Sequence, residues 1–205
     1  MLELHLARCL HKSFNSSNIL FFGLEGLKDK SAKDWMSRID LTQPYIASFG
    51  TAQPDSSFEQ SEPACAAAMS EEESMYRHPV YVARTAATDQ SQGRGSSVGG
   101  RRMLQPRYHR AFDVYSLGCV LLEIFTWTPL RSLGWSARTH ANNPKAWRES
   151  LEKAAKKNVL FYAGPLATEI VVWCLAASAD PDCAEGGDLE AFCWEVLEKL
   201  DQVCV

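Results

Sequence analysis

The sequence predicts a mainly α-helical fold that carries one small β-hairpin. Beyond residue 112, apolar residues recur at helical spacing in several long segments. Before that point, two short runs are rich in aromatic and β-branched residues and are bounded by polar residues and proline, which is typical of strands. A chain of 205 residues can bury about 70% of its unfolded surface, so we expect one domain, residues 1–205, with its own core.

The two predicted strands are residues 18–22 and 45–49, which we expect to pair as a hairpin. Their connection is longer than most hairpin loops and contains a predicted helical turn around Ala32–Ile39. Two further segments, residues 51–74 and 83–102, are rich in small and polar residues. We predict that both are flexible loops.

A helical subdomain is predicted over residues 112–205. From Val114 to Trp127, apolar residues occupy almost every direction around the helix axis, which indicates a helix buried on all sides. Pro129 helps to end this helix. Most tryptophans are expected in the core, whereas Trp135, which lies between a glycine and a serine, is a candidate interface residue.

Three more helices are expected after the central one. Residues from Ala146 to Val159 form an amphipathic, basic segment, and Pro165 suits the first turn of a helix over Leu166–Ala177. Asp188 is a predicted N-cap for the last helix. The apolar face of that helix would consist of Leu189, Phe192, Cys193, Val196, Leu197 and Leu200.

Composition excludes several classes of function. A net charge of −4 is too small to steer the chain to nucleic acid, and its one arginine cluster is interpreted as a solvated loop. Seven cysteines without Cys-x-x-Cys spacing indicate free thiols in a reducing compartment, with no zinc site. No leader is evident, and no apolar run approaches the roughly 18–20 residues of a membrane span. We therefore expect a soluble, cytoplasmic or otherwise intracellular protein without a metal site.

Two short sequence motifs bear on the function of the chain. The first begins His11-Lys12-Ser13 and ends at Asn18, and the second is Ser48-Phe49-Gly50. They resemble the catalytic loop and the metal-binding loop of a eukaryotic protein kinase, each without its aspartate. In that family the first aspartate accepts the proton of the substrate hydroxyl, and such help is worth about 10²–10⁴-fold in rate. Ser13 stands in its place, and a hydroxyl is no such base near neutral pH.

The second missing aspartate binds Mg²⁺ in kinases. Ser48 replaces it, and Asn18 supplies one uncharged oxygen, whereas Mg²⁺ is usually held through one or two carboxylates plus phosphates. The resemblance implies ATP and Mg²⁺ as ligands, with Phe49 and Gly50 positioning the loop. Given the lost carboxylates, we expect neither ligand to bind unless Asp40 or Asp55 substitutes.

Further motifs follow in the order of the kinase family. Tyr76-Arg77-His78-Pro79-Val80 lies where kinases close their activation segment, and Phe112–Ile124 resembles the central helix of the large lobe. The resemblance implies structural roles for Tyr76 and Pro79, and it implies that Asp113 braces the backbone of the catalytic loop. Val80 replaces the glutamate of the family's Ala-Pro-Glu motif. The amino-acid sequences of these motifs are similar to those of degenerate kinase-like domains in fungal proteins that carry HeLo-type or prion-inhibition domains.

The resemblance covers residues 4–205 and only the large, C-terminal lobe. Because the first motif begins at residue 11, we expect the small N-terminal lobe to be absent, with its glycine-rich loop and lysine. The helix that precedes the catalytic loop in kinases would also be missing. We therefore predict that the chain is a fragment or needs a protein partner.

These observations favour a catalytically inactive pseudokinase that acts as an interaction or regulatory module. The alternative is an ATP-dependent Ser/Thr kinase that is active only with a missing N-lobe, and a third possibility is a decaying gene product without a stable fold. A hydrolase that uses His11 as its base with Ser13 is disfavoured, since no Gly-x-Ser-x-Gly motif occurs. Ser70 and Ser74 are phosphorylation candidates or merely solubilising residues.

Overall fold

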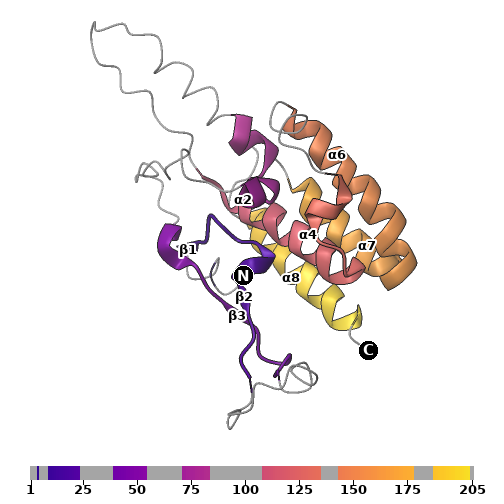
Figure 1. Cartoon of the computed structure of the whole chain (residues 1–205), viewed down its shortest axis with the longest axis horizontal. Coiled ribbons are helices and arrows are strands. Elements are labelled where there is room, and N and C mark those ends of the chain that lie inside the picture. The colour runs from indigo at the N-terminus through magenta and orange to yellow at the C-terminus, as the bar shows by residue number, and fades with distance from the viewer. Residues whose placement is uncertain are drawn as a thin grey trace, which may run out of the picture.

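The computed structural model describes Leu4 and residues 9–23, 39–54, 71–83, 108–134, 143–177 and 187–203. Within these residues the protein is mostly helical, with two short antiparallel strand pairs. Figure 1 shows the long helices gathered together and a hairpin that projects away from them. The predicted class, mainly α with a small β-hairpin, is confirmed.

The predicted hairpin is formed by β2 (Ile19–Leu20) and β3 (Tyr45–Ile46), which pair antiparallel. Each strand is shorter than the run of apolar residues that predicts it. An isolated antiparallel bridge between Gly23 and Ile39 extends the pairing. The helical turn predicted around Ala32–Ile39 is therefore wrong at Ile39, and its other residues lie outside the described part of the chain.

A second strand pair joins β1 (Cys9–Leu10) to β4 (Gln53–Pro54). With the 3₁₀ turn η3 (Phe49–Thr51), β4 occupies the start of the segment predicted to be a flexible loop. Its other end is helical, in α2 (Glu71–Met75). The loop prediction is thus wrong at both ends, and at β4 the reason is that composition carries no information on pairing with a segment far away in the sequence.

The second predicted loop, residues 83–102, overlaps a helical stretch at residues 79–83 by one residue. The rest of that loop lies outside the described residues. Before β2, the 3₁₀ turn η1 (Ser16–Asn18) ends the first motif and leads directly into the strand.

The central helix α4 (Arg110–Thr126) is buried along most of its length. The His109 side chain caps its first turn by accepting a hydrogen bond from the Ala111 amide. Trp127 ends it in a left-handed conformation with φ of 49°, shortly before Pro129. The prediction of burial on all sides fails at the end of the helix, where Ile124 is 50% exposed and Trp127 87% exposed.

The next helix, α6 (Pro144–Ala154), begins with features expected of a helix start. The Asn143 side chain accepts a hydrogen bond from the Ala146 amide, and Pro144 occupies the first turn, where its missing N–H removes no helical bond. The helix continues into a π-helical turn, η6 (Ala155–Val159). Together they cover the amphipathic segment that the sequence predicts.

Helix α7 (Leu160–Ala176) follows without a loop but is broken at Gly164, whose φ of 84° and ψ of −176° are not helical. Pro165 then starts a second helical stretch, as predicted. By length and composition the stretch Lys145–Ala176 could cross a membrane, which corrects the expectation that nothing of this kind is present, and 33% of its apolar window is buried. Core helices pass the same test, so location in the cell stays a prediction.

The last helix, α8 (Gly187–Val203), begins one residue before the predicted N-cap, Asp188. Val196 is buried as predicted, but Leu197 on the same predicted face is 37% exposed. Lys199 binds the carboxylate of Glu169 at 2.6 Å, which helps to hold α8 against α7.

The core lies where α4 crosses α7. Gly118 of α4 faces Cys174, and a Cβ atom built on this glycine would lie 2.7 Å from the Cys174 Cβ. Among the described cysteines, Cys119 and Cys174 are buried, and both are free thiols, as expected. The prediction that most tryptophans are core residues holds for Trp147, whereas Trp127 and Trp194 are exposed. Trp135 lies outside the described residues.

We predict that Gly118→Ala destabilises the protein by about 1–2 kcal/mol, since overpacking outweighs the better helix propensity of alanine. The added methyl group would also lie 3.0 Å from the Leu175 amide nitrogen, which cannot rotate away. Urea unfolding measures the change. Gly50→Ala is the control, because nothing lies within 4 Å of its Cβ position. Equal stability of the two variants would contradict this packing argument.

Candidate functional site

The first motif is held by one buried carboxylate, that of Asp113 in the first turn of α4. The amides of His11 and Lys12 donate to its two oxygens at 2.8 and 3.0 Å, and the Tyr108 hydroxyl donates at 2.9 Å. Asp113 is fully buried and has no access to water, so these three donors take the place of its hydration. This is the contact that the resemblance implied for Asp113.

Lys12 is unusual in both backbone and side chain. Its φ of 69° is left-handed, and it is only 6% exposed, with its ammonium 5.7 Å from the centre of the Tyr108 ring. Burial lowers the pKa of the ammonium, and the charge of Asp113 partly opposes this effect. We therefore interpret Lys12 as a structural residue that helps to hold the loop in place.

His11 ties the first motif to the second. Its Nε2 lies 2.9 Å from the carbonyl oxygen of Ala47, and because a carbonyl can only accept, Nε2 carries the proton. The imidazole also packs against the Phe49 ring, with 4.9 Å between centroids. Among the described contacts, no hydrogen bond joins the imidazole to Ser13. The arrangement thus offers no support for a His–Ser hydrolytic pair.

Ser13 is embedded in local hydrogen bonds. Its hydroxyl lies 2.9 Å from the hydroxyl of Thr51, which also donates to the His11 carbonyl at 3.2 Å. The side-chain amides of Asn15 and Asn18 donate to the Ser13 carbonyl, at 3.1 and 2.6 Å. The structure therefore brings Ser13 and Asn18 together. Thr51, which sequence reasoning missed, holds the two loops at this point, and no local signal identifies it.

The second motif lies beside the first. The Ala47 amide donates to the Asn18 carbonyl at 2.8 Å, which places Ser48 next to the end of the first motif. Ser48 is exposed and left-handed, with φ of 65°, while Phe49 is 44% exposed. In the part of the chain that is described, no three His, Cys, Asp or Glu side chains form a group able to hold a metal ion.

Asp40, one of the two candidates for a substitute carboxylate, lies away from this site. Asp40 accepts hydrogen bonds from the amide and hydroxyl of Thr42, and these bonds lower the pKa of its carboxyl group. It lies at the far end of the hairpin, where its amide donates to the Phe22 carbonyl. Asp55 lies outside the described residues.

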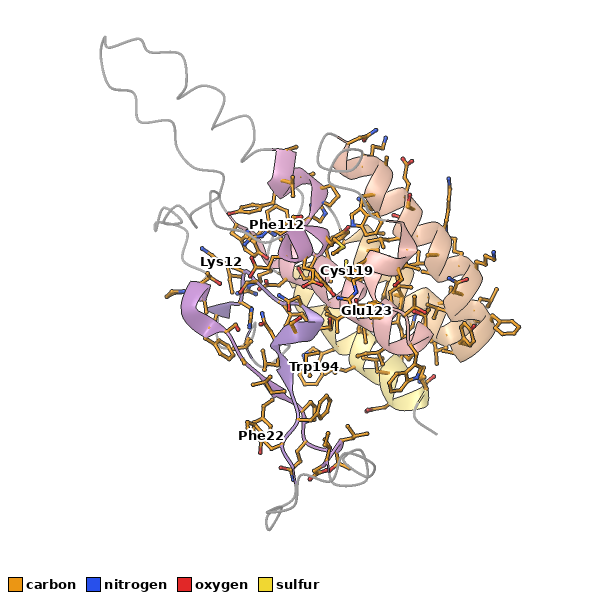
Figure 2. The ribbon with its side chains drawn as sticks, in the orientation of Figure 1. Lys12, Phe22, Phe112, Cys119, Glu123 and Trp194 are labelled. Carbon is orange, nitrogen blue, oxygen red and sulfur yellow. The ribbon has the colours of Figure 1, made fainter. Side chains whose placement is uncertain are left out.

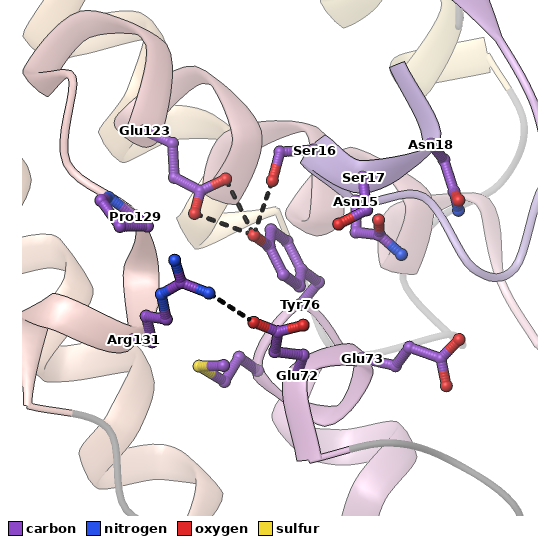
Figure 3. Close-up of a pocket in the computed structure, with 11 residues that line it drawn as sticks. Asn15, Ser16, Ser17, Asn18, Glu72, Glu73, Tyr76, Glu123, Pro129 and Arg131 are labelled. Atoms are coloured by element: carbon purple, nitrogen blue, oxygen red, sulfur yellow. Dashed lines mark hydrogen bonds and ion pairs between the residues drawn. The ribbon is translucent and has the colours of Figure 1, made fainter. Parts of the chain in front are cut away.

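A cavity of about 360 Å³ opens beside the first motif (Figure 3). It is lined by the 15–18 segment, by α2, by the end of α4 and by the turn η5 (Leu130–Leu133). Four segments that are distant in the sequence therefore meet around one recess.

Tyr76 and Glu123 form the inner wall of this cavity. The Tyr76 hydroxyl lies 2.8 Å from both carboxylate oxygens of Glu123 and 2.9 Å from the Ser16 hydroxyl. Since a carboxylate only accepts, Tyr76 donates to Glu123 and accepts from Ser16. The Leu130 amide adds a 2.7 Å bond to Glu123. Sequence reasoning missed Glu123, although a lone acid within an apolar helix is a usable signal.

The cavity has an excess of negative charge. Glu72, Glu73 and Glu123 line it, with Arg131 as the one cation among the described lining residues. Arg131 pairs with Glu72 at 2.9 Å on the exposed side. Asn15 is 7% exposed, and its side-chain oxygen has no hydrogen-bond partner among the described groups. Carboxylates and an amide oxygen suit a cationic or donor-rich group better than an anion such as a phosphate.

Of the predicted structural residues Tyr76 and Pro79, only Tyr76 is among the residues that line the cavity. Tyr76 contributes to the cavity, and Pro79 is buried at the start of the helical stretch 79–83. Gly50 is exposed within η3 and contacts nothing near its Cβ position.

Comparison with known proteins adds no relative to these observations. The chain matches no protein-family model, no curated protein and no solved structure. Any assignment of function therefore depends on the motifs and contacts described above.

We predict that Asp113→Ala destabilises the protein by about 2–6 kcal/mol, because two buried amides lose their acceptor at about 1–3 kcal/mol each. Urea unfolding followed by circular dichroism measures the loss. Tyr108→Phe removes only the third donor and is expected to cost about 1 kcal/mol. If both variants lost the same stability, the role given to Asp113 would be wrong.

Stability is also predicted to fall at alkaline pH. Burial, followed by the charge of Asp113 for Tyr108 and by Cys119 for Tyr115, raises the pKa of both hydroxyls well above the usual range. The folded state therefore keeps protons that the unfolded state releases above about pH 10. Each tyrosine then lowers the free energy of unfolding by about 1.4 kcal/mol per pH unit.

Urea unfolding at several pH values between about 9 and 11 tests this slope. In the variant Tyr115→Phe, the free energy of unfolding should fall less steeply with pH, by about 1.4 kcal/mol per pH unit. Ionisation of Tyr115 near pH 10 in a protein that remains folded would contradict the prediction.

Proposed function

We propose that the chain is a catalytically inactive, protein-kinase-like large lobe, a pseudokinase, that acts as an interaction or regulatory module. The motif order and the contact between Asp113 and the amides of His11 and Lys12 support the kinase-like part of the proposal. The packing of His11 on Phe49, which brings the two motif remnants together, also supports it.

The observation that carries the inactive assignment is the state of Ser13. A kinase base must accept a proton from the substrate hydroxyl, and this position holds a hydroxyl engaged with Thr51. Ser48 at the metal-binding position is equally uncharged. Phosphoryl transfer depends on metal ions and on charge stabilisation, so the loss of both carboxylates removes more than a proton acceptor.

The negatively charged cavity supports a binding role. It contains a hydrogen-bonded wall made by Tyr76 and Glu123, and its lining includes the carboxylates of Glu72 and Glu73. A donor-rich segment of a protein partner matches this lining. Binding at such a site needs no catalytic group.

A thermal melt with Mg·ATP tests the proposal. Nucleotide at 100 times its dissociation constant would stabilise a binding-competent chain by about 2.7 kcal/mol, and we expect no shift. Mg²⁺ alone and ATP with a chelator serve as controls. A shift that needs both components and disappears in Asn18→Ala would contradict the inactive assignment and would favour the ATP-dependent kinase.

A further inference from the structure

Where α6 passes through η6 into α7, the exposed surface of the helix combines lysines with large apolar side chains. We call it the Lys–aromatic face, and it consists of Lys153, Lys156, Lys157, Leu160, Phe161 and Tyr162. Leu160 is 49% exposed, Phe161 81% and Tyr162 68%. Three consecutive large apolar residues with this exposure are uncommon on the surface of a protein that remains free in water.

The orientation of this face is set by burial on the opposite side of the helix. Leu151, Ala155 and Val159 are fully buried in the core. Lys153, Lys156, Lys157, Leu160 and Phe161 are exposed on the sides of the helix that these residues leave uncovered, and Tyr162 is exposed at its end. Figure 1 shows α6 and α7 along the outer side of the helices. The Lys–aromatic face is therefore a fixed feature of the fold and is not a frayed end.

The charge of the face is opposite to that of the whole chain. The chain carries −4, yet residues 153–162 contain three lysines and no acid. None of these lysines forms an ion pair with a described residue, whereas the preceding turn is neutralised by the pair of Arg148 and Glu152 at 2.9 Å. The exposed Glu149 lies one turn before Lys153, so the basic character is confined to the end of the helix.

The aromatic rings lie at a corner of the fold. Phe161 and Tyr162 contact each other edge to face, with 5.0 Å between centroids, just before the helix breaks at Gly164. The two exposed rings follow three lysines in the sequence, and this combination of apolar and basic side chains matches the boundary of an anionic lipid layer. Tyrosine combines an apolar ring with a polar tip, a combination typical of the boundary between lipid and water.

We propose that the Lys–aromatic face docks the protein on an anionic lipid surface, with the helix lying along it. Phe161 and Leu160 enter the boundary between headgroups and acyl chains, while Tyr162 stays at headgroup level. The three lysines lie over the anionic headgroups. The proposal is independent of the pseudokinase assignment, because it uses no residue of the cavity or of the two motifs.

Co-sedimentation with vesicles tests the proposal. The whole chain is mixed with vesicles of phosphatidylcholine, or with vesicles in which about a third of the lipid is phosphatidylserine. We expect binding to the second kind, weakened by salt because the attraction between lysines and headgroups is screened. Phe161→Ser with Tyr162→Ser should lower the bound fraction at least about tenfold. In the double variant Lys156→Gln/Lys157→Gln, the loss of each lysine should lower binding about fivefold.

Matched controls separate this face from unspecific adhesion. Phe22→Ser removes a phenylalanine that is 57% exposed at the hairpin, away from the helices (Figure 2), and Lys145→Gln removes a lysine in the first turn of α6. Both should bind like the unchanged chain. All these residues are exposed, and circular dichroism checks that each variant keeps its fold. Equal binding to both kinds of vesicle, no binding to either, or equal loss in the controls overturns the proposal.

Discussion

The buried carboxylate of Asp113 is the interaction on which the rest of the site depends. It accepts hydrogen bonds from two amides 101 and 102 residues earlier in the chain, and so joins the first motif to the central helix. A charge in this position is tolerated because three donors surround it, one of them the Tyr108 hydroxyl. Helix α4 is in turn held by the close approach of Gly118 to α7. The position of the loop is thereby set by the core.

Around this support, the side chains that would carry chemistry are used for structure. His11 donates to the Ala47 carbonyl, Ser13 is engaged with Thr51, and Asn18 donates to the Ser13 carbonyl. Hydrogen bonds of this kind each stabilise the loop by about 1 kcal/mol. They involve no proton transfer to or from a substrate. A site with these contacts is well suited to present a fixed surface, and this is the physical basis of the proposed binding role.

Two surfaces of opposite charge are available to partners. The cavity beside Tyr76 contains carboxylates with few cations, whereas the Lys–aromatic face contains lysines without described ion-pair partners. They are built from different segments and suit different kinds of partner. Separate charged surfaces allow one chain to bind a cationic segment and to lie on an anionic layer at the same time.

The order of residues along the chain was enough to predict the helical class, the hairpin and the break before Pro165, because periodicity and proline act locally. It also singled out Asp113, whose carboxylate accepts from the His11 and Lys12 amides, while the roles given to Ser13 and Ser48 stay predictions. Contacts between distant segments were beyond it: the β1–β4 pair, Thr51 beside Ser13, and the Tyr76–Glu123 wall appear only when the chain is folded. Exposure was likewise decided by packing, since Trp127 and Phe161 are as apolar as the core residues but are not covered by any element in the described part of the chain.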